Sequence, residues 1–466
     1  MTRYISTRGA APPIGFLEAV LAGLAPDGGL YSPEVWPTFT TEEIAAFAGQ
    51  PYAQVAAAVL SKFAGSDIEP RVLREMCDEA YSTFSHKAVT PLSQIGDNLF
   101  LLELFHGPTL AFKDVAMQLL GRLYEHALKS KQRTLTIICA TSGDTGGAAV
   151  EAFRGRANVR IVALFPEGRI SEVQRRFMTT ASDANVRCLS IQGSFDDCQN
   201  IVKAAFSDES FRTGVDLSGV NSINWARIAA QAVYYFTAAV ALGAPGRPVA
   251  FCTPTGNFGD AFAGFAAKQM GLPIARIIAA TNSNDIVARA FEEGRYSRGA
   301  VTHTQSPAMD IQIASNFERL YFETVRREGV ETARTFAAFA ETGAVTLPPG
   351  ALAAMRATFS GASVDEAETA RTILSVLNET RSLIDPHTAV GVAAARRASL
   401  PDPTTPLVVL STAHPAKFPE AVLAASGRSP VAPASSGDLA VKPERFDRLP
   451  ADAETVKAYV RAFAGA

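Results

Sequence analysis

The residues best suited to bind a phosphate group lie in the segment 253–260, with the sequence TPTGNFGD. This segment follows an apolar run and precedes a helical pattern that begins near Ala261, so it indicates a turn between a strand and a helix. Gly256 and Gly259 permit a tight turn and a close approach of a ligand to the backbone. Backbone N–H groups that converge at the N-terminus of a helix bind anions, phosphate in particular. A plain strand–helix turn is the alternative, because glycine is common in such turns.

A second strand–helix turn, residues 139–147, is rich in hydroxyl groups and glycine. Thr141, Ser142 and Thr145 supply O–H donors, and the glycines between them keep the backbone N–H groups accessible. Such a loop can bind a carboxylate without a cationic side chain. Asp144 has a second interpretation as the N-cap of the following helix, which is the commoner use of aspartate at a helix start. The sequence leaves these two interpretations nearly even.

Lys113 stands between an apolar segment and a helical pattern that contains Leu119, Leu120 and Leu123. An exposed lysine at a helix start is the ordinary explanation. A lysine is, however, electrostatically unfavourable at the positive N-terminal end of a helix. Burial and positive neighbours lower the pKa of a lysine and leave its amine neutral, which is what attack on a carbonyl carbon requires.

The fourth segment, residues 408–418, joins an apolar run to a polar turn that carries Ser411, Thr412, His414 and Lys417. A hydroxyl group at the end of such a strand can hydrogen-bond a heteroaromatic nitrogen without full proton transfer. A solvated turn is the alternative. The sequence contains no G-x-S-x-G, H-E-x-x-H, G-x-x-x-x-G-K-[ST] or G-x-G-x-x-G motif. With six histidines in the chain, we expect no metal site.

Strands and helices that alternate from about residue 95 onward must position these four segments. Apolar runs predict strands at 98–104, 135–139, 159–165, 186–191, 249–252, 274–280 and 407–411. Helical patterns predict helices at 41–47, 53–63, 114–127, 147–153, 196–206, 260–270 and 351–358. This alternation predicts an α/β fold, with a parallel sheet covered by helices on both faces and binding sites at the carboxyl ends of its strands.

We expect the chain to have three parts. Residues 1–92 form a mainly helical N-terminal region, and residues 93–213 form a smaller α/β domain that includes Lys113. Residues 214–466 form a larger α/β domain with the phosphate-binding loop and a C-terminal extension. Within that extension, the Pro- and Ser-rich stretch 429–438 predicts a loop before a short terminal helix.

The composition excludes several kinds of partner. The 466 residues include 43 Lys and Arg against 46 Asp and Glu, a formal net charge of −3, so no global positive field favours nucleic acid or an anionic membrane. The five cysteines are scattered and form no C-x-x-C, which favours free thiols in a reducing compartment. The N-terminus lacks the apolar core of a signal peptide, and the uncharged stretch 228–246 indicates a buried helix rather than a membrane span. We therefore expect a cytoplasmic protein that acts on a small molecule.

Together the four segments resemble the threonine synthase family of pyridoxal-phosphate enzymes, which have the tryptophan-synthase-β fold type. HGPTLAFKD around Lys113 resembles the family's lysine motif, TSGDTGGAA its substrate loop, TPTGNFGDAFAG its cofactor-phosphate loop and STAHPAKF its C-terminal signature. The blocks YISTRG, GLAPDGGLY, GSFDDCQ and NSINWARI also match the branch with fungal and proteobacterial members. The resemblance covers nearly the whole chain. It implies fold type II of the pyridoxal-phosphate enzymes, with two open, twisted, mostly parallel sheets flanked by helices and a mainly helical N-terminal region.

The implied cofactor is pyridoxal 5′-phosphate, held by Lys113 as the catalytic Schiff-base lysine. The loop 256–259 would bind the cofactor's phosphate group, with Asp260 beside that loop. Thr412 would face the pyridine nitrogen, where a neutral partner suits elimination rather than transamination. The residues that the resemblance assigns to the cofactor are Lys113, Gly256, Asn257, Phe258, Gly259, Asp260 and Thr412.

The implied reaction converts O-phospho-L-homoserine and water to L-threonine and phosphate by β,γ-elimination and replacement, the last step of threonine biosynthesis. Ser142, Asp144 and Thr145 would lie on the side of the substrate carboxylate. A second anion site must bind the substrate phosphate, and guanidinium and ammonium groups suit phosphate. Its candidate ligands, which could equally form structural contacts, are Asn224, Arg227 and Lys417.

Two other functions stay open at this point. A dehydratase or phospho-lyase of the same fold would share the lysine and the phosphate loop, but a dehydratase would release a 2-oxo acid and ammonia. A phospho-lyase would not add water back. A non-catalytic metabolite-binding paralogue could dispense with the Schiff-base amine, so the intact Lys113 argues against it. We expect a monomer or a homodimer.

Overall fold

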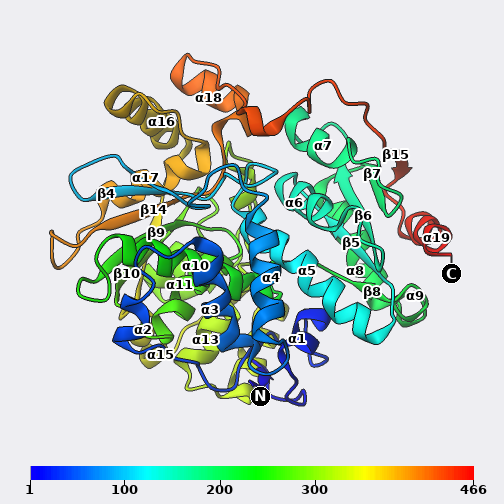
Figure 1. The fold of residues 1–466 in the computed structure, drawn as a ribbon, viewed down its shortest axis with the longest axis horizontal. Helices are drawn as coiled ribbons and strands as arrows, with labels where there is room; N and C mark the ends of the chain where they lie inside the picture. The colour runs from blue at the N-terminus through cyan, green and yellow to red at the C-terminus, as the bar shows by residue number, and fades with distance from the viewer. Residues whose placement is uncertain (1, 466) are drawn as a thin grey trace.

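Two open, twisted sheets lie side by side in the computed structural model, which describes residues 2–465 (Figure 1). The larger sheet has six strands in the order β13 (Phe359–Ser363), β10 (Ile274–Thr281), β9 (Val249–Pro254), β14 (Leu407–Ser411), β4 (Leu99–Glu103) and β3 (Leu92–Gln94). The smaller has five strands in the order β15 (Asp447–Pro450), β7 (Val186–Gln192), β6 (Val159–Pro166), β5 (Leu135–Ala140) and β8 (Leu217–Ser218). Every pairing in them is parallel except β3 with β4.

Two short antiparallel pairs lie outside both sheets, β1 (Tyr4–Ser6) with β2 (Tyr31–Pro33) and β11 (Arg295–Ser297) with β12 (Ala344–Thr346). The N-terminal region contains α1 (Phe16–Ala22), α2 (Thr41–Ala45), α3 (Tyr52–Ala64) and α4 (Pro70–Tyr81). The helices connected to the smaller sheet are α5 (Lys113–Lys131), α6 (Asp144–Phe153), α7 (Glu172–Thr179), α8 (Phe195–Ser207), α9 (Glu209–Gly214) and α19 (Ala453–Ala464).

The remaining helices belong to the larger sheet and its connections. They are α10 (Trp225–Ala241), α11 (Gly259–Gln269), α12 (Ile286–Glu293), α13 (Phe317–Thr324), α14 (Gly329–Thr342), α15 (Pro349–Arg356), α16 (Glu366–Thr380), α17 (Pro386–Arg397) and α18 (Pro419–Ser426). Three single turns of 3₁₀ helix are η1 (Pro307–Met309), η2 (Pro415–Lys417) and η3 (Ala434–Ser436).

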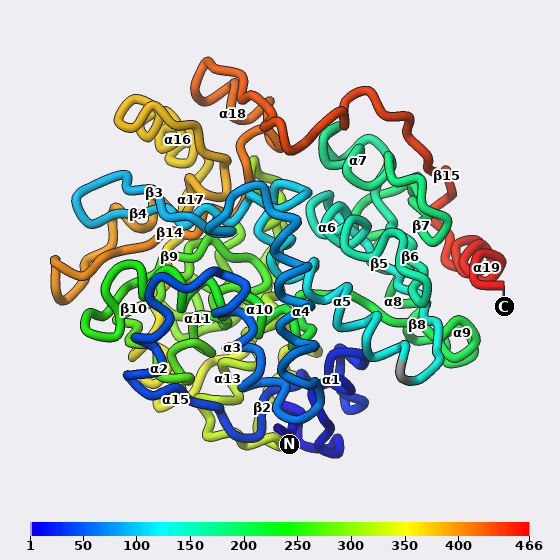
Figure 2. The backbone as a smooth tube through the Cα atoms, in the orientation of Figure 1, coloured from blue at the N-terminus to red at the C-terminus, as the bar shows by residue number. Residues whose placement is uncertain are grey.

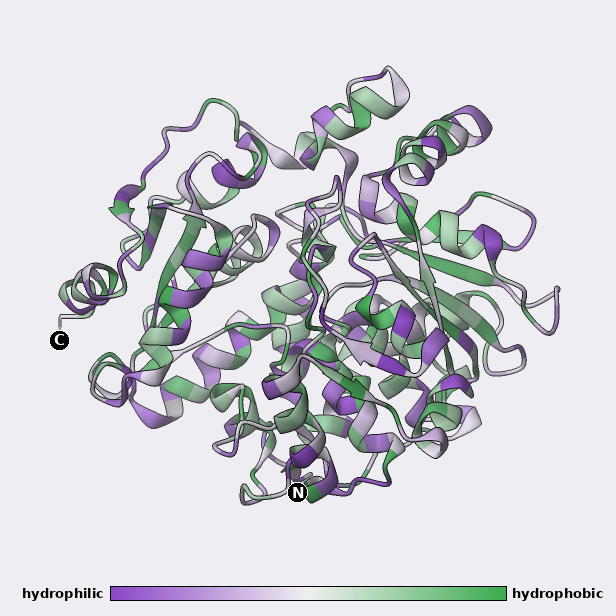
Figure 3. Cartoon of the chain, turned by 180° about the vertical axis from the view of Figure 1, so that it is seen from behind, coloured by the Kyte–Doolittle hydropathy of each residue, from purple (hydrophilic) through white to green (hydrophobic). Residues whose placement is uncertain are grey.

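The predicted α/β architecture is confirmed, with parallel strands buried on both faces. All six residues of β9 and all five of β14 are buried. Strands covered on both faces must be apolar almost throughout, and the strands are the most hydrophobic segments in Figure 3, while polar residues concentrate on the outer helices. All seven predicted strands are present, each ending within two residues of its predicted bounds. The sequence pattern does not predict the edge strands β13, β3, β15 and β8; that of β13, FSGAS, is small and polar.

The two sheets do not follow the three consecutive segments expected from the sequence. Strand β4 lies between residues 93 and 213 but pairs with β14 of the larger sheet. Strand β15 comes near the C-terminus but pairs with β7 of the smaller sheet. After α18 the chain therefore crosses back to the smaller sheet, as the orange-to-red trace in Figure 2 shows. Within the predicted loop 429–438 the chain forms only the short turn η3.

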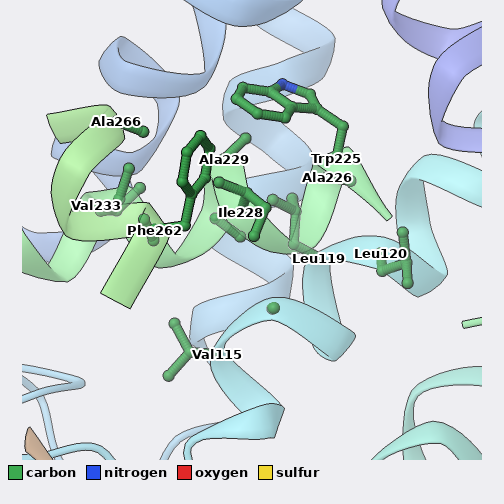
Figure 4. Packing of buried hydrophobic residues seen from close by; sticks show 14 of the residues in the cluster. Val115, Leu119, Leu120, Trp225, Ala226, Ile228, Ala229, Val233, Phe262 and Ala266 are labelled. Carbon is green, nitrogen blue, oxygen red and sulfur yellow. The ribbon is translucent and has the colours of Figure 1, made fainter. Parts of the chain in front are cut away.

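The predicted buried helix at 228–246 is α10, which starts earlier and ends at Ala241. Figure 4 shows side chains of α10 packed against those of α5 on one side and α11 on the other. Trp225 is fully buried, and its ring lies 5.7 Å from that of Tyr4 and 5.4 Å from that of Phe63. It thus joins the N-terminal region to the larger sheet. Within the described residues, no helix combines the length and apolar character that a bilayer crossing requires.

We expect Trp225→Ala to destabilise the fold by about 3–5 kcal/mol, because it removes a fully buried aromatic side chain and leaves a cavity. Scanning calorimetry should show an apparent melting temperature lowered by several degrees. Val330→Ala is the control, since 83% of that side chain is exposed, and its melting temperature should match the parent. Equal melting temperatures for all three proteins would contradict this account of the core.

Candidate active site

Lys113 is the first residue of α5. The next residue, Asp114, fixes the turn that precedes the helix and positions Lys113. Asp114 is fully buried, and its two carboxylate oxygens accept hydrogen bonds from the backbone N–H (2.8 Å) and the hydroxyl (2.6 Å) of Thr109. Burial raises the pKa of Asp114 to about 6. These two hydrogen bonds hold the turn 109–113, so Lys113 occupies a defined position at the start of its helix.

Backbone hydrogen bonds join this lysine turn to the end of β14. The N–H of Phe112 donates to the carbonyl of Thr412 (2.8 Å), and the N–H of His414 donates to the carbonyl of Leu110 (3.0 Å). The hydroxyl group of Thr412 has no hydrogen-bond partner among residues 2–465. It is therefore available to a ligand beside Lys113, at the carboxyl end of a central strand.

Asp144 forms ion pairs with two buried lysines. Its Oδ1 lies 2.8 Å from Nζ of Lys417, and its Oδ2 lies 3.7 Å from Nζ of Lys113. The amide of Gln174 donates a further hydrogen bond to Oδ1 (3.1 Å). The N-cap interpretation of Asp144 is wrong, because Gly143 occupies the N-cap position of α6 and the carboxylate of Asp144 faces the lysines.

The buried position of Lys113 makes its amine a weaker base than that of an ordinary lysine. Burial is the main cause of its lowered pKa; the charges of Lys417 and Arg227 lower the pKa further, while Asp144 and Asp260 oppose the shift. Burial alone raises the pKa of Asp144, but the charges of Lys417 and Lys113 outweigh it and lower the pKa overall. An ionised carboxylate thus lies beside an amine that loses its proton readily.

The turn before α6 presents a group of unused donors. The hydroxyl oxygen of Thr141 accepts hydrogen bonds from the N–H groups of Gly143 (2.9 Å) and Gly146 (2.8 Å), which shapes the turn. Among the described residues, the hydroxyls of Ser142 and Thr145 have no partner, and neither do the backbone N–H groups at 142, 144 and 145. Donors at a helix N-terminus suit a carboxylate.

The turn before α11 presents a second group of donors. No residue of the described chain accepts a hydrogen bond from the backbone N–H groups of 256–259. Phe258 takes the N-cap position with a left-handed backbone (φ 63°). A Cβ atom at Gly256 would lie 3.0 Å from the carbonyl oxygen of Ala308 and 3.2 Å from Cα of Met309. The loop is therefore a close-packed anion cradle of the kind that binds phosphate.

Side chains outside the loop hold this cradle in place. The backbone N–H and the side-chain amide of Asn316 both donate to the carbonyl of Asn257 (3.1 Å each), and the amide also donates to the carbonyl of Ser222 (3.2 Å). The carboxylate of Asp260 accepts a hydrogen bond from the hydroxyl of Thr255. Asp260 therefore stabilises the loop from within.

A buried histidine supports the other side of the cradle. Nδ1 of His387 lies 2.7 Å from Oδ2 of Asp385, and Nε2 accepts a hydrogen bond from the backbone N–H of Ala308 (3.2 Å). This arrangement makes Nδ1 the protonated nitrogen and fixes η1, the turn that packs against Gly256.

The three residues expected to bind a substrate phosphate have different surroundings. Asn224 caps α10 through Ala226 and donates to the carbonyl of Val20 (2.7 Å), so its amide is used within the protein. Lys417 donates to the carbonyl of Thr109 (2.7 Å) and pairs with Asp144.

Of these three residues, Arg227 is the one whose buried side chain keeps an unused hydrogen-bond donor among the described residues. It is 3% exposed, donates one hydrogen bond from Nη1 to the carbonyl of Val220 (3.3 Å), and its Nε has no partner among the described residues. Burial lowers its pKa to about 10, a shift that the charge of Asp260 opposes. A buried guanidinium with free donors indicates an anionic ligand.

The residues present fit pyridoxal phosphate. The amine of Lys113, the donors of 256–259 and the free hydroxyl of Thr412 supply a covalent anchor, a phosphate cradle and a partner for the ring. No sequence pattern predicts the supporting residues Gln174, Asn316 and His387. The one local signal, Ser171 three positions before Gln174, predicts only the start of a helix.

Comparisons with known proteins agree with this site, and the matches cover nearly the whole chain. Residues 3–81 match the family model of the threonine synthase N terminus, residues 84–412 match that of pyridoxal-phosphate dependent enzymes, and residues 388–460 match that of the threonine synthase C-terminal domain. A threonine synthase of Pseudomonas aeruginosa is 49% identical over 98% of both chains. That of Saccharomyces cerevisiae is 41% identical over 90% of this chain and 88% of its own.

Solved structures give the same result. The pyridoxal-phosphate-bound threonine synthase from Brucella melitensis superposes with a TM-score of 0.97 at 53% identity, covering all of both chains. The yeast threonine synthase superposes with a TM-score of 0.93 at 38% identity, covering 99% of both. With the lysine, the cradle and the full-length similarity in agreement, this chain belongs to the threonine synthase family of pyridoxal-phosphate-dependent enzymes.

Proposed function

We propose that the substrate of this enzyme is O-phospho-L-homoserine, which it converts with water to L-threonine and phosphate. The observation that carries the proposal is the position of Lys113 between two sets of unused donors. Its Nζ lies 3.7 Å from Oδ2 of Asp144 at the N-terminus of α6, and the charge of Asp260 at the N-terminus of α11 also acts on it. A third unused donor belongs to the buried Arg227. A phosphorylated amino acid and a phosphorylated cofactor together present three anionic groups.

We assign the cofactor's phosphate to the loop 256–259 and its ring nitrogen to the hydroxyl of Thr412. The bound cofactor supplies an electron sink for the carbanion chemistry of amino acids. Asp260 supports the loop through Thr255 rather than facing the phosphate.

The α6 turn and Lys113 divide the work on the substrate's amino-acid end. Ser142, Thr145 and the free N–H groups of the turn bind the α-carboxylate and orient the Cα–H bond. The neutral amine of Lys113 accepts the proton from Cα and later returns one. The carboxylate of Asp144 faces that amine and raises its pKa, which opposes the lowering caused by burial.

The substrate's other end carries the leaving group. Arg227 binds the phosphate that departs from Cγ, because its guanidinium is buried and retains free donors. Water then adds at Cβ, which distinguishes this reaction from the dehydratase and phospho-lyase alternatives. Lys417 acts through Asp144 and the lysine turn, and Asn224 serves the structure.

We also propose a cytoplasmic location and a monomeric or homodimeric state. All five cysteines are buried and free, which suits a reducing compartment. Light scattering on the purified protein would decide the oligomeric state.

The first test is a product assay with O-phospho-L-homoserine and added cofactor, in which threonine, phosphate and 2-oxobutyrate are quantified together. We expect threonine and phosphate in equal amounts. Phosphate with 2-oxobutyrate would replace the proposal with a lyase reaction, and no product from cofactor-loaded protein would refute the substrate.

Lys113→Ala should lower turnover on the order of 10³-fold or more, because it removes the proton-transfer group. The absorbance band of covalently bound cofactor should also be lost. Lys129→Ala on the same helix is the matched control, since that lysine is exposed. Near-normal turnover in a folded Lys113→Ala protein would exclude the assigned role.

Gly256→Val should weaken cofactor binding at least tenfold, because the added side chain meets the carbonyl of Ala308 and pushes η1 or the loop away. Equilibrium titration with pyridoxal phosphate measures the effect. Gly350→Val is the control, as a Cβ there meets no atom within 4 Å. Unchanged affinity in the Gly256 variant would show that the loop is only a turn.

A further inference from the structure

Gln174 is a buried side chain near the site that the reaction scheme does not use. It belongs to α7, is 4% exposed, and its Nε2 donates to Oδ1 of Asp144 (3.1 Å). Its Oε1 accepts a hydrogen bond from the backbone N–H of Ser171 (3.2 Å), and its own N–H donates to the Ser171 hydroxyl (3.2 Å). The capping box of α7 therefore holds the amide in one orientation, with its N–H toward Asp144.

The turn before α6 is shaped around this side chain. Gly143 has a φ of 125°, which L side chains rarely adopt, and a Cβ atom there would lie 2.4 Å from Cδ of Gln174. The glycine thus lets α7 approach α6 closely enough for the amide to reach Asp144.

The two oxygens of the Asp144 carboxylate have different tasks. Oδ1 receives both Lys417 and Gln174, whereas Oδ2 faces Lys113. The other charged or titratable groups around this pair are Arg227 and Asp260 near Lys113, and His387 near Asp144.

We propose that Gln174 is a positioning residue for the Asp144–Lys113 pair. Its amide N–H holds one oxygen of the carboxylate so that the other faces the amine, and it thereby helps to set the pH at which Lys113 becomes available. The inference rests on the proposed role of Lys113 but not on the identity of the substrate.

The C-terminal segment secures α7 in this position. Both carboxylate oxygens of Glu444 accept hydrogen bonds from Arg175 (2.7 and 2.9 Å), and the hydroxyl of Thr179 donates to one of them (2.7 Å). The N–H of Arg445 donates to the carbonyl of Thr179 (2.6 Å). In Figure 2 this segment runs past α7 on its way to β15. Residues near the end of the chain thus support a side chain in the site.

Gln174→Glu gives a sharp test because it preserves shape. Glutamate retains the capping box with Ser171, but it places an oxygen where the amide N–H now faces Asp144. The added negative charge stabilises the ammonium form of Lys113. Since only the neutral amine attaches the cofactor, attachment rises with pH through the pKa of Lys113, and a raised pKa moves that midpoint upward.

The measurement is the pH midpoint of covalent cofactor attachment, followed by visible absorbance with pyridoxal phosphate and no substrate. We expect a midpoint about one pH unit higher in Gln174→Glu than in the parent. Gln312→Glu makes the same change at a buried amide whose hydrogen bonds within the described residues go to the backbone at 299 and 300, and its midpoint should equal the parent's.

Gln174→Met removes the hydrogen bond at similar volume without adding charge. Asp144 is then held less firmly toward the amine and stabilises the ammonium form less, so we expect a midpoint below the parent's. A midpoint equal to the parent's, or raised as in Gln174→Glu, would overturn the proposal. An unchanged midpoint in folded Gln174→Glu would overturn it as well. Because no substrate is present, failure to form threonine would refute the proposed reaction while leaving this result intact.

Discussion

The arrangement of this protein depends on one buried carboxylate shared by two lysines. Asp144 is 5% exposed, Lys113 8% and Lys417 1%, so three charges lie where water cannot solvate them. Such burial is costly unless geometry and further hydrogen bonds are in place. Lys417 meets this condition through the carbonyl of Thr109, and Asp144 through Gln174. The three residues belong to α5, α6 and η2, which are distant in sequence. These elements must therefore pack in one accurate arrangement for the buried charges to be compensated.

The two helix N-termini at the site carry a related cost. The N–H groups at 142, 144 and 145 and those at 256–259 lack protein partners among the described residues, and unpaired donors that are withdrawn from water reduce stability. An anion that binds there satisfies donors that the fold leaves open, so binding energy also becomes folding energy. Stability and ligand affinity are thus coupled through the same backbone groups, which makes the cradle a preformed electrostatic site rather than a flexible loop.

The sequence predicts those parts of the site that consist of consecutive residues with a characteristic pattern. The lysine turn, the glycine-rich cradle and the hydroxyl-rich turn each occupy fewer than ten consecutive residues, and the strands before them are apolar throughout. Gln174, Asn316 and His387 could not be predicted this way, because each supports the site through contacts with residues distant in sequence. The two lysine partners of Asp144 could not be predicted either. An aspartate at a helix start has the same local sequence pattern whether it caps the helix or pairs with lysines. The edge strands β13 and β15 were not predicted, because strands at the edge of a sheet tolerate polar residues and so lack an apolar run.

The pairing of β4 with β14 and of β7 with β15 has a consequence for synthesis of the chain. A ribosome releases residue 99 long before residue 407, and residue 186 long before residue 447, so β4 and β7 each lack a strand neighbour until those later residues are synthesised. Closing such distant pairs is slow, and open strand edges are prone to aggregate. The larger sheet therefore cannot be completed before β14 is synthesised, nor the smaller sheet before β15.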